Sequence, residues 1–172
     1  MKIRDAQYWV RRLQLTAHPE GGYYRETYRS DLIIPASALG GTFKGPRNVS
    51  TAIYFLLEKK QCSAFHRIRS DELWHFHMGD SLLIHIILDN GTLQSQRLGP
   101  HIESGDAFQV VVPKGCWFAA EVLNPESYSL CSCTVAPGFA FDDFELADPE
   151  HLAKTYPQYM DLIKRMQHAA SS

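Results

Sequence analysis

The stretch FHRIRSDELWHFHMG, residues 65–79, contains two apolar-rich runs separated by the polar turn RSD. The runs at 63–68 and 72–78 are short and rich in aromatic and aliphatic residues, which is typical of two β-strands joined by a tight turn. Such a turn brings His66 close to Glu72. An imidazole and a carboxylate held together in this way are able to ligate a divalent metal or to act as an acid–base pair.

Similar short runs recur along the chain on both sides of this stretch. Turn residues separate them, and Asn90-Gly91 predicts a type I′ hairpin between two of them. Many short strands with turns between them are typical of an antiparallel barrel or sandwich. The predicted strands cover residues 23–28, 50–58, 63–68, 72–78, 81–89, 92–98, 106–113, 117–123 and 128–136.

Helices are predicted only near the two ends of the chain. Residues 6–13 place apolar side chains at helical spacing behind Asp5, a suitable N-cap, and we expect this helix to stop at His18-Pro19. At the other end, Asp148-Pro149 is typical of an N-cap followed by the first helical residue. A last helix is expected around residues 157–166.

The segment HPEGGYYRETYRS, residues 18–30, is predicted to be a turn that leads into a strand. Gly21-Gly22 permits a sharp reversal with positive φ, after which aromatic and charged residues alternate. We expect His18 to be a solvated loop residue, because loop histidines usually are, and a place in a pocket is the alternative. The Gly- and Pro-rich connection at 30–48 is predicted to form a loop or hairpin on the surface.

The composition limits the class of protein. At 172 residues, 45% of them hydrophobic, the chain is long enough for one domain with a substantial core. Seventeen Lys and Arg against 19 Asp and Glu give a net charge of −2, which does not favour a nucleic-acid partner. No apolar run reaches the length of a bilayer span, and the start MKIRDAQYWV lacks the apolar core of a secretion signal. We therefore expect a cytoplasmic protein without a membrane partner.

Four cysteines occur, at positions 62, 116, 131 and 133. Without an export signal, they are expected to be reduced. Cys131 and Cys133 share one face of a predicted strand, and their spacing does not match the paired cysteines of structural zinc sites. We interpret the cysteines as buried structural residues.

The opening stretch resembles the first motif of the cupin superfamily, which reads His-x-His, three or four residues, Glu, six residues, Gly. His66, Glu72 and Gly79 stand at matching positions, and Ile68 stands where the motif has its second histidine. PKGCWF, residues 113–118, resembles the second motif, Pro-x-Gly-x-x-His, with Phe118 in place of the histidine.

A narrower resemblance extends over about residues 5–165. The segments HPEGGYYRETYRS, RNVSTAIYFLLE, FHRIRSDELWHFHMGD, VVVPKGCWFAA and CTVAPGFAFDDFEL together are similar to one uncharacterised, single-domain cupin family. The family is similar in fold to metal-free sugar-nucleotide epimerases and to seed storage cupins. The resemblance implies an all-β protein, a cupin-type antiparallel double-sheet jelly-roll barrel with short N- and C-terminal helices. It implies one domain over residues 1–172, with the core barrel at about 20–146.

The resemblance bears directly on metal binding. A typical cupin binds its metal through three histidines and a glutamate, of which this chain keeps His66 and Glu72. Two ligands hold a catalytic divalent ion poorly. His75 and His77 alternate with Glu72 along the strand, so we expect them on the outer face. We predict no cofactor. A divalent metal held by His66 and Glu72, with water and another side chain, is the alternative.

The pair His66 and Glu72 has two interpretations. The two side chains form either a buried structural hydrogen-bonded pair or a catalytic acid–base dyad with His66 as proton acceptor. The candidate substrate-binding residues are Trp74, Tyr54, Arg47 and Phe118, because aromatic side chains and a few polar groups commonly line the mouth of a barrel. Solvation in a loop is the other interpretation of Arg47.

Three functions remain open. The first is metal-independent epimerisation or isomerisation of a small polar, sugar-like molecule, as the resemblance to epimerases implies, and the second is non-catalytic binding of a small ligand. The third is a metal-dependent oxygenase or isomerase. We also expect a homodimer, because cupins resemble one another in pairing through sheet edges, and YYRETYR at 23–29 is the candidate edge.

Overall fold

The computed structural model describes residues 4–167. Its α-helices are short and lie at the two ends of the chain: α1 (Ala6–Leu13), α2 (Pro149–Thr155) and α3 (Met160–Arg165). The strands between them are β1 (Thr16–Ala17), β2 (Tyr23–Arg29), β3 (Ile33–Ile34), β4 (Arg47–Asn48), β5 (Thr51–Glu58), β6 (Cys62–Arg67), β7 (Asp71–Gly79), β8 (Leu82–Ile87), β9 (Leu93–Leu98), β10 (Gln109–Val112), β11 (Trp117–Val122), β12 (Tyr128–Ala136) and β13 (Glu145–Leu146).

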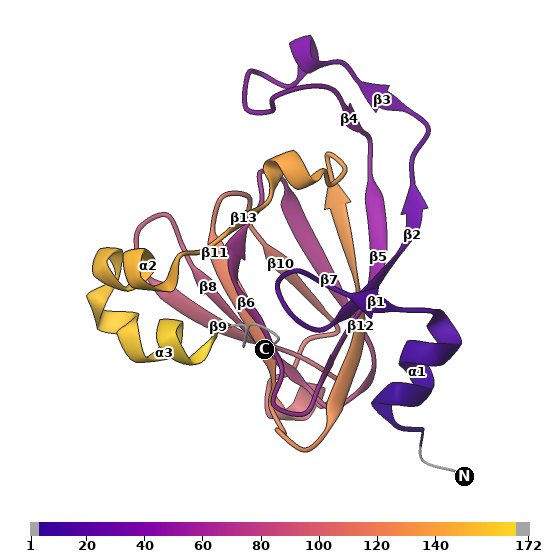
Figure 1. Cartoon of the computed structure of the whole chain (residues 1–172), viewed down its shortest axis with the longest axis vertical. Helices are drawn as coiled ribbons and strands as arrows, with labels where there is room; N and C mark the ends of the chain where they lie inside the picture. Colours follow the sequence, from indigo (N-terminus) through magenta and orange to yellow (C-terminus); the bar gives the residue numbers. More distant parts are fainter. Residues whose placement is uncertain (1–3, 168–172) are drawn as a thin grey trace.

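Two antiparallel sheets face each other and form the barrel (Figure 1). The larger sheet has six strands in the order β1-β2-β5-β12-β7-β10, and the smaller has five in the order β13-β6-β11-β8-β9. Most long strands pair with strands that are distant in sequence, as when β12 lies between β5 and β7, whereas β8 and β9 are consecutive and form a hairpin. The predicted all-β, double-sheet antiparallel barrel is therefore confirmed, and its strands reach from Thr16 to Leu146.

The strands bury alternate residues because successive side chains point to opposite faces of a sheet. On β7, Glu72 and Trp74 are buried between the sheets, whereas His75 and His77 lie on the outer face, as parity predicts. The central core contains aliphatic and aromatic side chains from both sheets together with buried, unbridged Cys131 and Cys133. Cys62 is also a free thiol, but it is only partly buried, so its interpretation as a core residue is wrong.

Short helices cover the outer faces of the two sheets. The Asp5 side chain caps α1 by accepting the Tyr8 N–H at 2.8 Å, and α1 packs on Leu56 and Leu130 of the larger sheet. Asp148 caps α2 in the same way, and Ile163 of α3 packs against the outer face of the smaller sheet. Among the described residues, no helix is long and apolar enough to cross a membrane.

Two local predictions are wrong. Helix α1 ends at Leu13 rather than at His18-Pro19, because Gln14 takes the left-handed conformation with φ 54° and closes the helix. The turn at Asn90-Gly91 is not type I′, which requires positive φ at both central residues. Only Gly91 has positive φ, 79°, and its N–H donates to the Leu88 carbonyl in a longer three-residue loop.

The segment between β2 and β5 forms an arm that extends beyond the barrel (Figure 1). Strands β3 and β4 pair within this arm, in agreement with the predicted surface hairpin. The tip of the arm bends back over one end of the barrel, where the Thr42 carbonyl accepts a hydrogen bond from Arg69 at 2.8 Å. This end of the barrel contains the candidate site.

Candidate functional site

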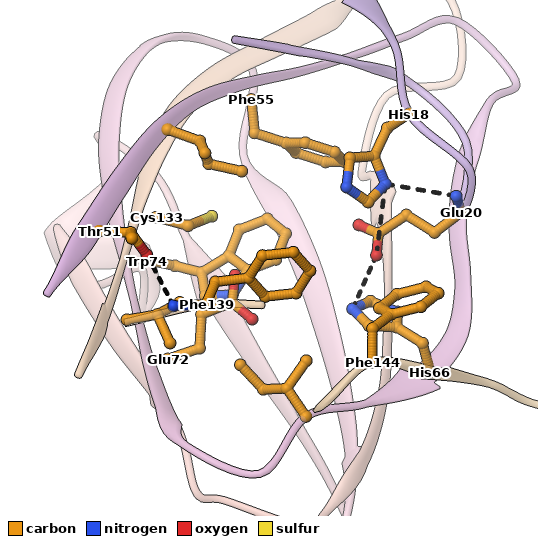
Figure 2. A pocket seen from close by; sticks show the side chains of 13 residues that line it. His18, Glu20, Thr51, Phe55, His66, Glu72, Trp74, Cys133, Phe139 and Phe144 are labelled. Carbon is orange, nitrogen blue, oxygen red and sulfur yellow. Dashed lines mark hydrogen bonds and ion pairs between the residues drawn. The ribbon is translucent and has the colours of Figure 1, made fainter. Parts of the chain in front are cut away.

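A cavity of about 40 Å³ lies between the two sheets at the end of the barrel below the arm (Figure 2). Its wall combines apolar side chains with a group of polar ones that come from both sheets and from the turn before β2. The polar residues are His18, Glu20, Thr51, His66, Glu72, Trp74 and Cys133. The apolar residues are Ile53, Phe55, Ile68, Val135, Phe139 and Phe144.

His66, on β6, is hydrogen bonded at both ring nitrogens. Its Nδ1 lies 2.7 Å from the Ala64 carbonyl oxygen, and its Nε2 lies 2.8 Å from the Glu20 Oε2. Because both partners are acceptors, both nitrogens must donate, and the ring is an imidazolium. Burial acts to lower the pKa of His66, but the charge of Glu20 and the hydrogen bond to it raise that pKa above its usual value. A ring without a free lone pair is not suited to accept a proton, so the role proposed from sequence for His66 does not fit this geometry.

Glu20 is the carboxylate partner of His66. It is 4% exposed and also accepts the Ser63 hydroxyl at 2.8 Å through Oε1. Burial acts to raise the pKa of Glu20, but the charge of His66 and the hydrogen bonds from His66 and Ser63 hold it below its usual value. The site therefore contains a buried ion pair that the sequence did not predict.

The HPEGG turn brings Glu20 into the barrel. The Glu20 carbonyl accepts the Ala64 N–H at 2.9 Å, which joins the turn to β6 two residues before His66. Gly22 has φ +74°, and a Cβ there would lie 2.7 Å from the Leu56 carbonyl oxygen, so this close approach requires glycine. The Gly21-Gly22 pair directly before a strand was the only sequence signal of this reversal.

His18 is buried, and the expectation that it is a solvated loop residue is wrong. Its Nδ1 accepts the Glu20 backbone N–H at 3.3 Å, so the proton of the neutral ring is on Nε2. Burial lowers the pKa of His18 more than the Glu20 carboxylate raises it. The ring packs edge-on against Tyr24, with 4.6 Å between the ring centroids. His18 therefore contributes a neutral imidazole to the cavity wall.

Glu72 lines the same cavity, but it does not contact His66 directly. Within residues 4–167, no hydrogen bond or ion pair joins the two side chains. Burial raises the pKa of Glu72 to about 7, although the positive charge of His66 opposes this shift. The Cys133 thiol lies in the same cavity wall. Glu72 is thus a buried carboxyl group that titrates near neutrality and is not committed to a salt bridge.

Trp74 lies in the cavity wall two residues from Glu72, on the same face of β7. It is 1% exposed, and its indole Nε1 has no hydrogen-bond partner among the described residues. Its ring packs edge-on against Phe55 and Phe118, with centroid separations of 5.4 and 6.3 Å. A buried donor without a partner costs about 1–3 kcal/mol.

The other predicted binding residues lie outside the cavity. Tyr54 points to the opposite face of β5, where its ring contacts His77 and the layer under α1. Phe118 is fully buried behind His66, with 4.0 Å between the two ring centroids, and does not line the cavity. It packs against the imidazolium ring of His66.

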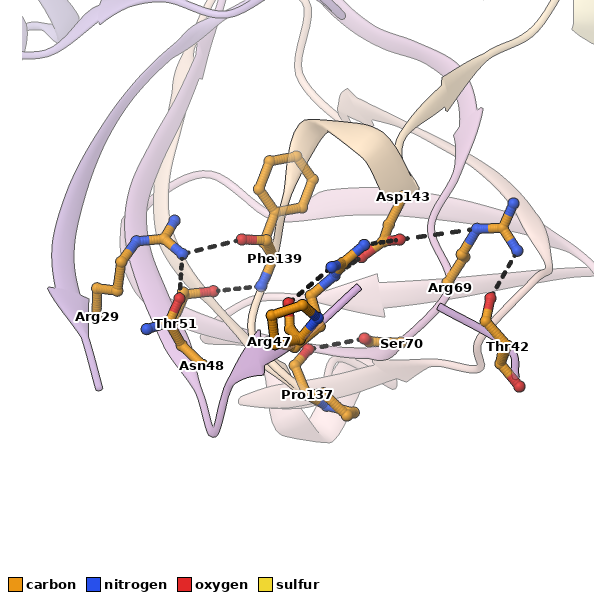
Figure 3. A network of polar contacts seen from close by, with 11 residues as sticks. Arg29, Thr42, Arg47, Asn48, Thr51, Arg69, Ser70, Pro137, Phe139 and Asp143 are labelled. Carbon is orange, nitrogen blue, oxygen red and sulfur yellow. Dashed lines mark hydrogen bonds and ion pairs between the residues drawn. The ribbon is translucent and has the colours of Figure 1, made fainter. Parts of the chain in front are cut away.

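Arg47 forms a buried ion pair with Asp143, with 2.5 Å from its Nε to Oδ2 and 2.7 Å from its Nη2 to Oδ1 (Figure 3). The prediction that Arg47 contacts a substrate is therefore not supported, since its guanidinium is committed to this carboxylate. The pair anchors the segment 139–144, and Phe139 and Phe144 of this segment line the cavity. The Phe139 N–H donates to the Thr51 hydroxyl at 3.0 Å, and its carbonyl accepts from Arg29 at 3.2 Å.

The residues present do not fit the metal centre that the sequence resemblance implies. Ile68 and Phe118 replace two of its ligands and have no atoms that ligate a metal. The Nε2 of His66 is already hydrogen bonded to Glu20. Among the described residues, no group of three or more His, Cys, Asp or Glu side chains is arranged to hold a metal ion. No metal step therefore enters the mechanism.

Comparisons with known proteins agree on a family. The family model described as Cupin superfamily (DUF985) matches residues 7–147. The uncharacterized protein YML079W of Saccharomyces cerevisiae is 31% identical over 148 residues, which cover 76% of this chain and 69% of the yeast protein.

Solved structures show the same relationship. Protein SO0799 from Shewanella oneidensis is 38% identical, with a TM-score of 0.87, and the match covers 98% of this chain and 100% of that one. A hypothetical protein from Leishmania major is 36% identical, with a TM-score of 0.86 and coverages of 96% and 99%. Oxalate decarboxylase from Bacillus subtilis is 14% identical, with a TM-score of 0.53 over 90% of this chain and 40% of that one, and shares the fold alone.

Proposed function

This chain belongs to the DUF985 family of the cupin superfamily, and we propose that its barrel binds a small polar carbonyl compound. In this proposal the protein transfers a proton at the carbon next to the carbonyl. One observation carries the proposal. Glu72, a carboxyl group with its pKa raised to about 7, lies in the same cavity wall as the unpartnered indole N–H of Trp74. A proton carrier and a hydrogen-bond donor for oxygen are the two groups that an isomerisation or epimerisation of this kind requires.

Glu72 is the proton carrier in this proposal. A general acid–base group works best when its pKa is near the working pH, since both protonation states are then available. In its ionised form the carboxylate takes the proton from the carbon, and the electron pair of the C–H bond moves into an enolate. The protonated Glu72 then returns a proton to a carbon of the same intermediate. No oxidant, reductant or second substrate is consumed.

Trp74 stabilises the oxygen of the intermediate. The negative charge that leaves the C–H bond collects on the carbonyl oxygen, and the Nε1–H of Trp74 has no other acceptor among the described residues. A preorganised donor in a water-poor cavity is worth more than the same donor in water, because it needs no reorientation during the reaction. Removal of one such donor typically reduces the rate by about 10²–10³-fold.

The ion pair of His66 and Glu20 is a fixed charge arrangement and not a proton relay. The imidazolium offsets the negative charge that develops in the cavity, and Glu20 prevents it from losing its proton. The Coulombic effect of His66 also acts to lower the pKa of Glu72 and so supports its ionised form. His66 and Glu20 are therefore positioning residues in this proposal.

Deuterium incorporation tests the proposed function. We expect the wild-type protein in D₂O to exchange the hydrogen next to the carbonyl in at least one member of a panel of small hydroxyaldehydes and hydroxyketones, followed by proton NMR. Glu72→Gln should slow the exchange by about 10²-fold or more, because the amide does not accept the proton. Glu126→Gln removes an exposed carboxylate and should leave the rate unchanged.

Two outcomes contradict this function. Exchange at the same rate in Glu72→Gln and in wild type would remove Glu72 from the reaction. Saturable binding of these compounds without any exchange in the wild-type protein would favour the alternative function, a non-catalytic small-ligand binding protein.

A further inference from the structure

A second hollow lies directly beside the cavity. It is an open groove of about 540 Å³, and Ile68 and Phe144 belong to the walls of both hollows. The inner cavity, at about 40 Å³, has room for only a few water molecules, since roughly 10–15 Å³ accommodates one. A ligand larger than this fits when its reacting end enters the cavity and the rest extends across Ile68 and Phe144 into the groove.

The groove is rich in charged side chains, with the cations in excess. Four of its lining residues are cationic and three are acidic, and Arg47 adds a further positive charge behind Asp143. The cationic residues are Lys44, Arg67, Arg69 and Lys114, and the acidic residues are Asp142, Asp143 and Glu145.

Most of the acidic groups are already neutralised by arginines. Arg67 pairs with Glu145 at 2.8 Å. Asp143 binds Arg47 through both oxygens and lies 3.7 Å from the Nε of Arg69. Figure 3 shows Arg69 between the Asp143 carboxylate and the Thr42 carbonyl.

The two lysines differ from the arginines. Neither Lys44 nor Lys114 has an ion-pair partner within 4.0 Å among residues 4–167, and both are exposed. They come from separate parts of the chain, Lys44 from the arm and Lys114 from the turn between β10 and β11. The Lys114 N–H donates to the Asp71 carboxylate at 2.8 Å, which fixes this turn beside the groove. Two unpaired ammonium groups that face one groove favour an anion with more than one negative charge.

We propose that this groove binds the phosphate group of the substrate, so that the substrate is a small phosphorylated carbonyl compound whose reacting end lies in the cavity. Lysine ammonium groups bind phosphate as point charges. The proposal rests on the proposed function, because it names the class of the substrate whose carbonyl end meets Glu72 and Trp74. In this proposal the groove binds and orients the substrate, and the reaction takes place in the cavity.

The test is direct binding of phosphorylated probes, measured by isothermal titration calorimetry with the full-length protein. We expect glycerol 1-phosphate to bind more tightly than inorganic phosphate, because it reaches both hollows, and glycerol to bind more weakly than either. The double variant Lys44→Met/Lys114→Met should bind glycerol 1-phosphate about tenfold more weakly, as expected for the loss of two partly solvated charge interactions. The matched control, Lys154→Met/Lys164→Met, removes the same charge from exposed positions on α2 and α3 and should bind within about twofold of wild type.

Three results would overturn the proposal. One is equal weakening in the groove variant and in the control, and another is equal affinity for inorganic phosphate and glycerol 1-phosphate. The third is succinate binding as tightly as glycerol 1-phosphate, which would assign the groove to carboxylates. The titration also separates this proposal from the proposed function. Glu72→Gln should retain phosphate binding, so a failure of deuterium exchange together with lysine-dependent phosphate binding contradicts the chemistry and not the groove.

Discussion

Glu20 and His66 form an ion pair inside the barrel, with 2.8 Å between Oε2 and Nε2. Glu20 precedes β2 of the larger sheet and His66 belongs to β6 of the smaller one, so the pair connects the two layers. Because His66 donates from both nitrogens, the buried proton remains on the ring, and Glu72 is left as the carboxyl group that titrates near neutrality. The division of roles between the two glutamates follows from this one contact.

Loss of the Glu20 charge should destabilise the protein and change the titration of His66. Glu20→Gln leaves the imidazolium buried without its counter-ion, and removal of one partner of a buried pair costs about 3–5 kcal/mol. We expect a loss in this range in urea unfolding, and a lowered pKa of His66 in NMR titration. The control is Glu145→Gln, whose pair with Arg67 is solvent-exposed and should contribute less than about 1 kcal/mol. Equal losses in the two variants would contradict the role of Glu20.

Ionisation of Glu72 should destabilise the folded protein as the pH rises. The unfolded chain releases this proton near the ordinary pKa of 4.5, whereas the folded protein holds it until about pH 7. The penalty therefore grows between these pH values and is complete above them. We expect Glu72→Gln to exceed wild type in stability by less than about 1 kcal/mol at pH 5 and by roughly 3 kcal/mol at pH 8.

Urea unfolding at both pH values measures this difference. Glu126→Gln provides the baseline for the removal of one surface carboxylate. A stability gain in Glu72→Gln that is the same at pH 5 and at pH 8 would show that Glu72 does not titrate between them.

Substitution of Trp74 should separate ligand recognition from folding. Trp74→Phe removes a buried N–H that has no partner among the described residues, while most of the aromatic packing remains. We expect the free energy of unfolding to change by less than about 2 kcal/mol and the deuterium exchange rate to fall by about 10²-fold. An unchanged exchange rate in a folded Trp74→Phe protein would remove the indole from the site.

The proton transfer should not depend on a divalent metal. The positions of two cupin ligands are occupied by Ile68 and Phe118, which have no donor atoms. We expect well under one equivalent of Mn, Fe, Ni or Zn by elemental analysis of protein purified without chelator, and an exchange rate that EDTA does not change. Stoichiometric metal that survives dialysis, with activity lost on its removal, would contradict this prediction.

We propose that the chain forms a homodimer through the edge of β2. On one side β2 pairs with β5 along its length, but on the other it pairs with β1 only at Tyr23 and Tyr24. The described residues therefore leave the edge at 25–29 open, and open edges favour strand pairing between chains. Sedimentation should show a dimer at micromolar concentration and a shift towards monomer in Tyr28→Asp, a change at a side chain that is 54% exposed. A wild-type monomer under these conditions would contradict the proposal.

The sequence alone predicted most of the barrel, and three of the residues that it indicated, His66, Glu72 and Trp74, line the cavity. Strand periodicity depends on local chain geometry, so the alternation along β7 was enough to predict that Glu72 and Trp74 point inward and that His75 and His77 point outward. The caps at Asp5 and Asp148 were predicted for the same reason, because each acts on an N–H within three residues of itself.

Only the tertiary structure decided which groups meet. Tyr54 stands in a strand that is apolar on both faces, since α1 covers its outer side, so alternation did not reveal which face lines the cavity. Arg47 and Asp143 are distant in sequence, and the burial of each depends on the other. Glu20 enters the barrel because the turn before β2 closes onto β6, and there Glu20 forms the ion pair with His66. Burial in the same cavity raises the pKa of Glu72. Periodicity reports the direction of a side chain within one strand, whereas burial and charge pairing arise only when distant segments pack together.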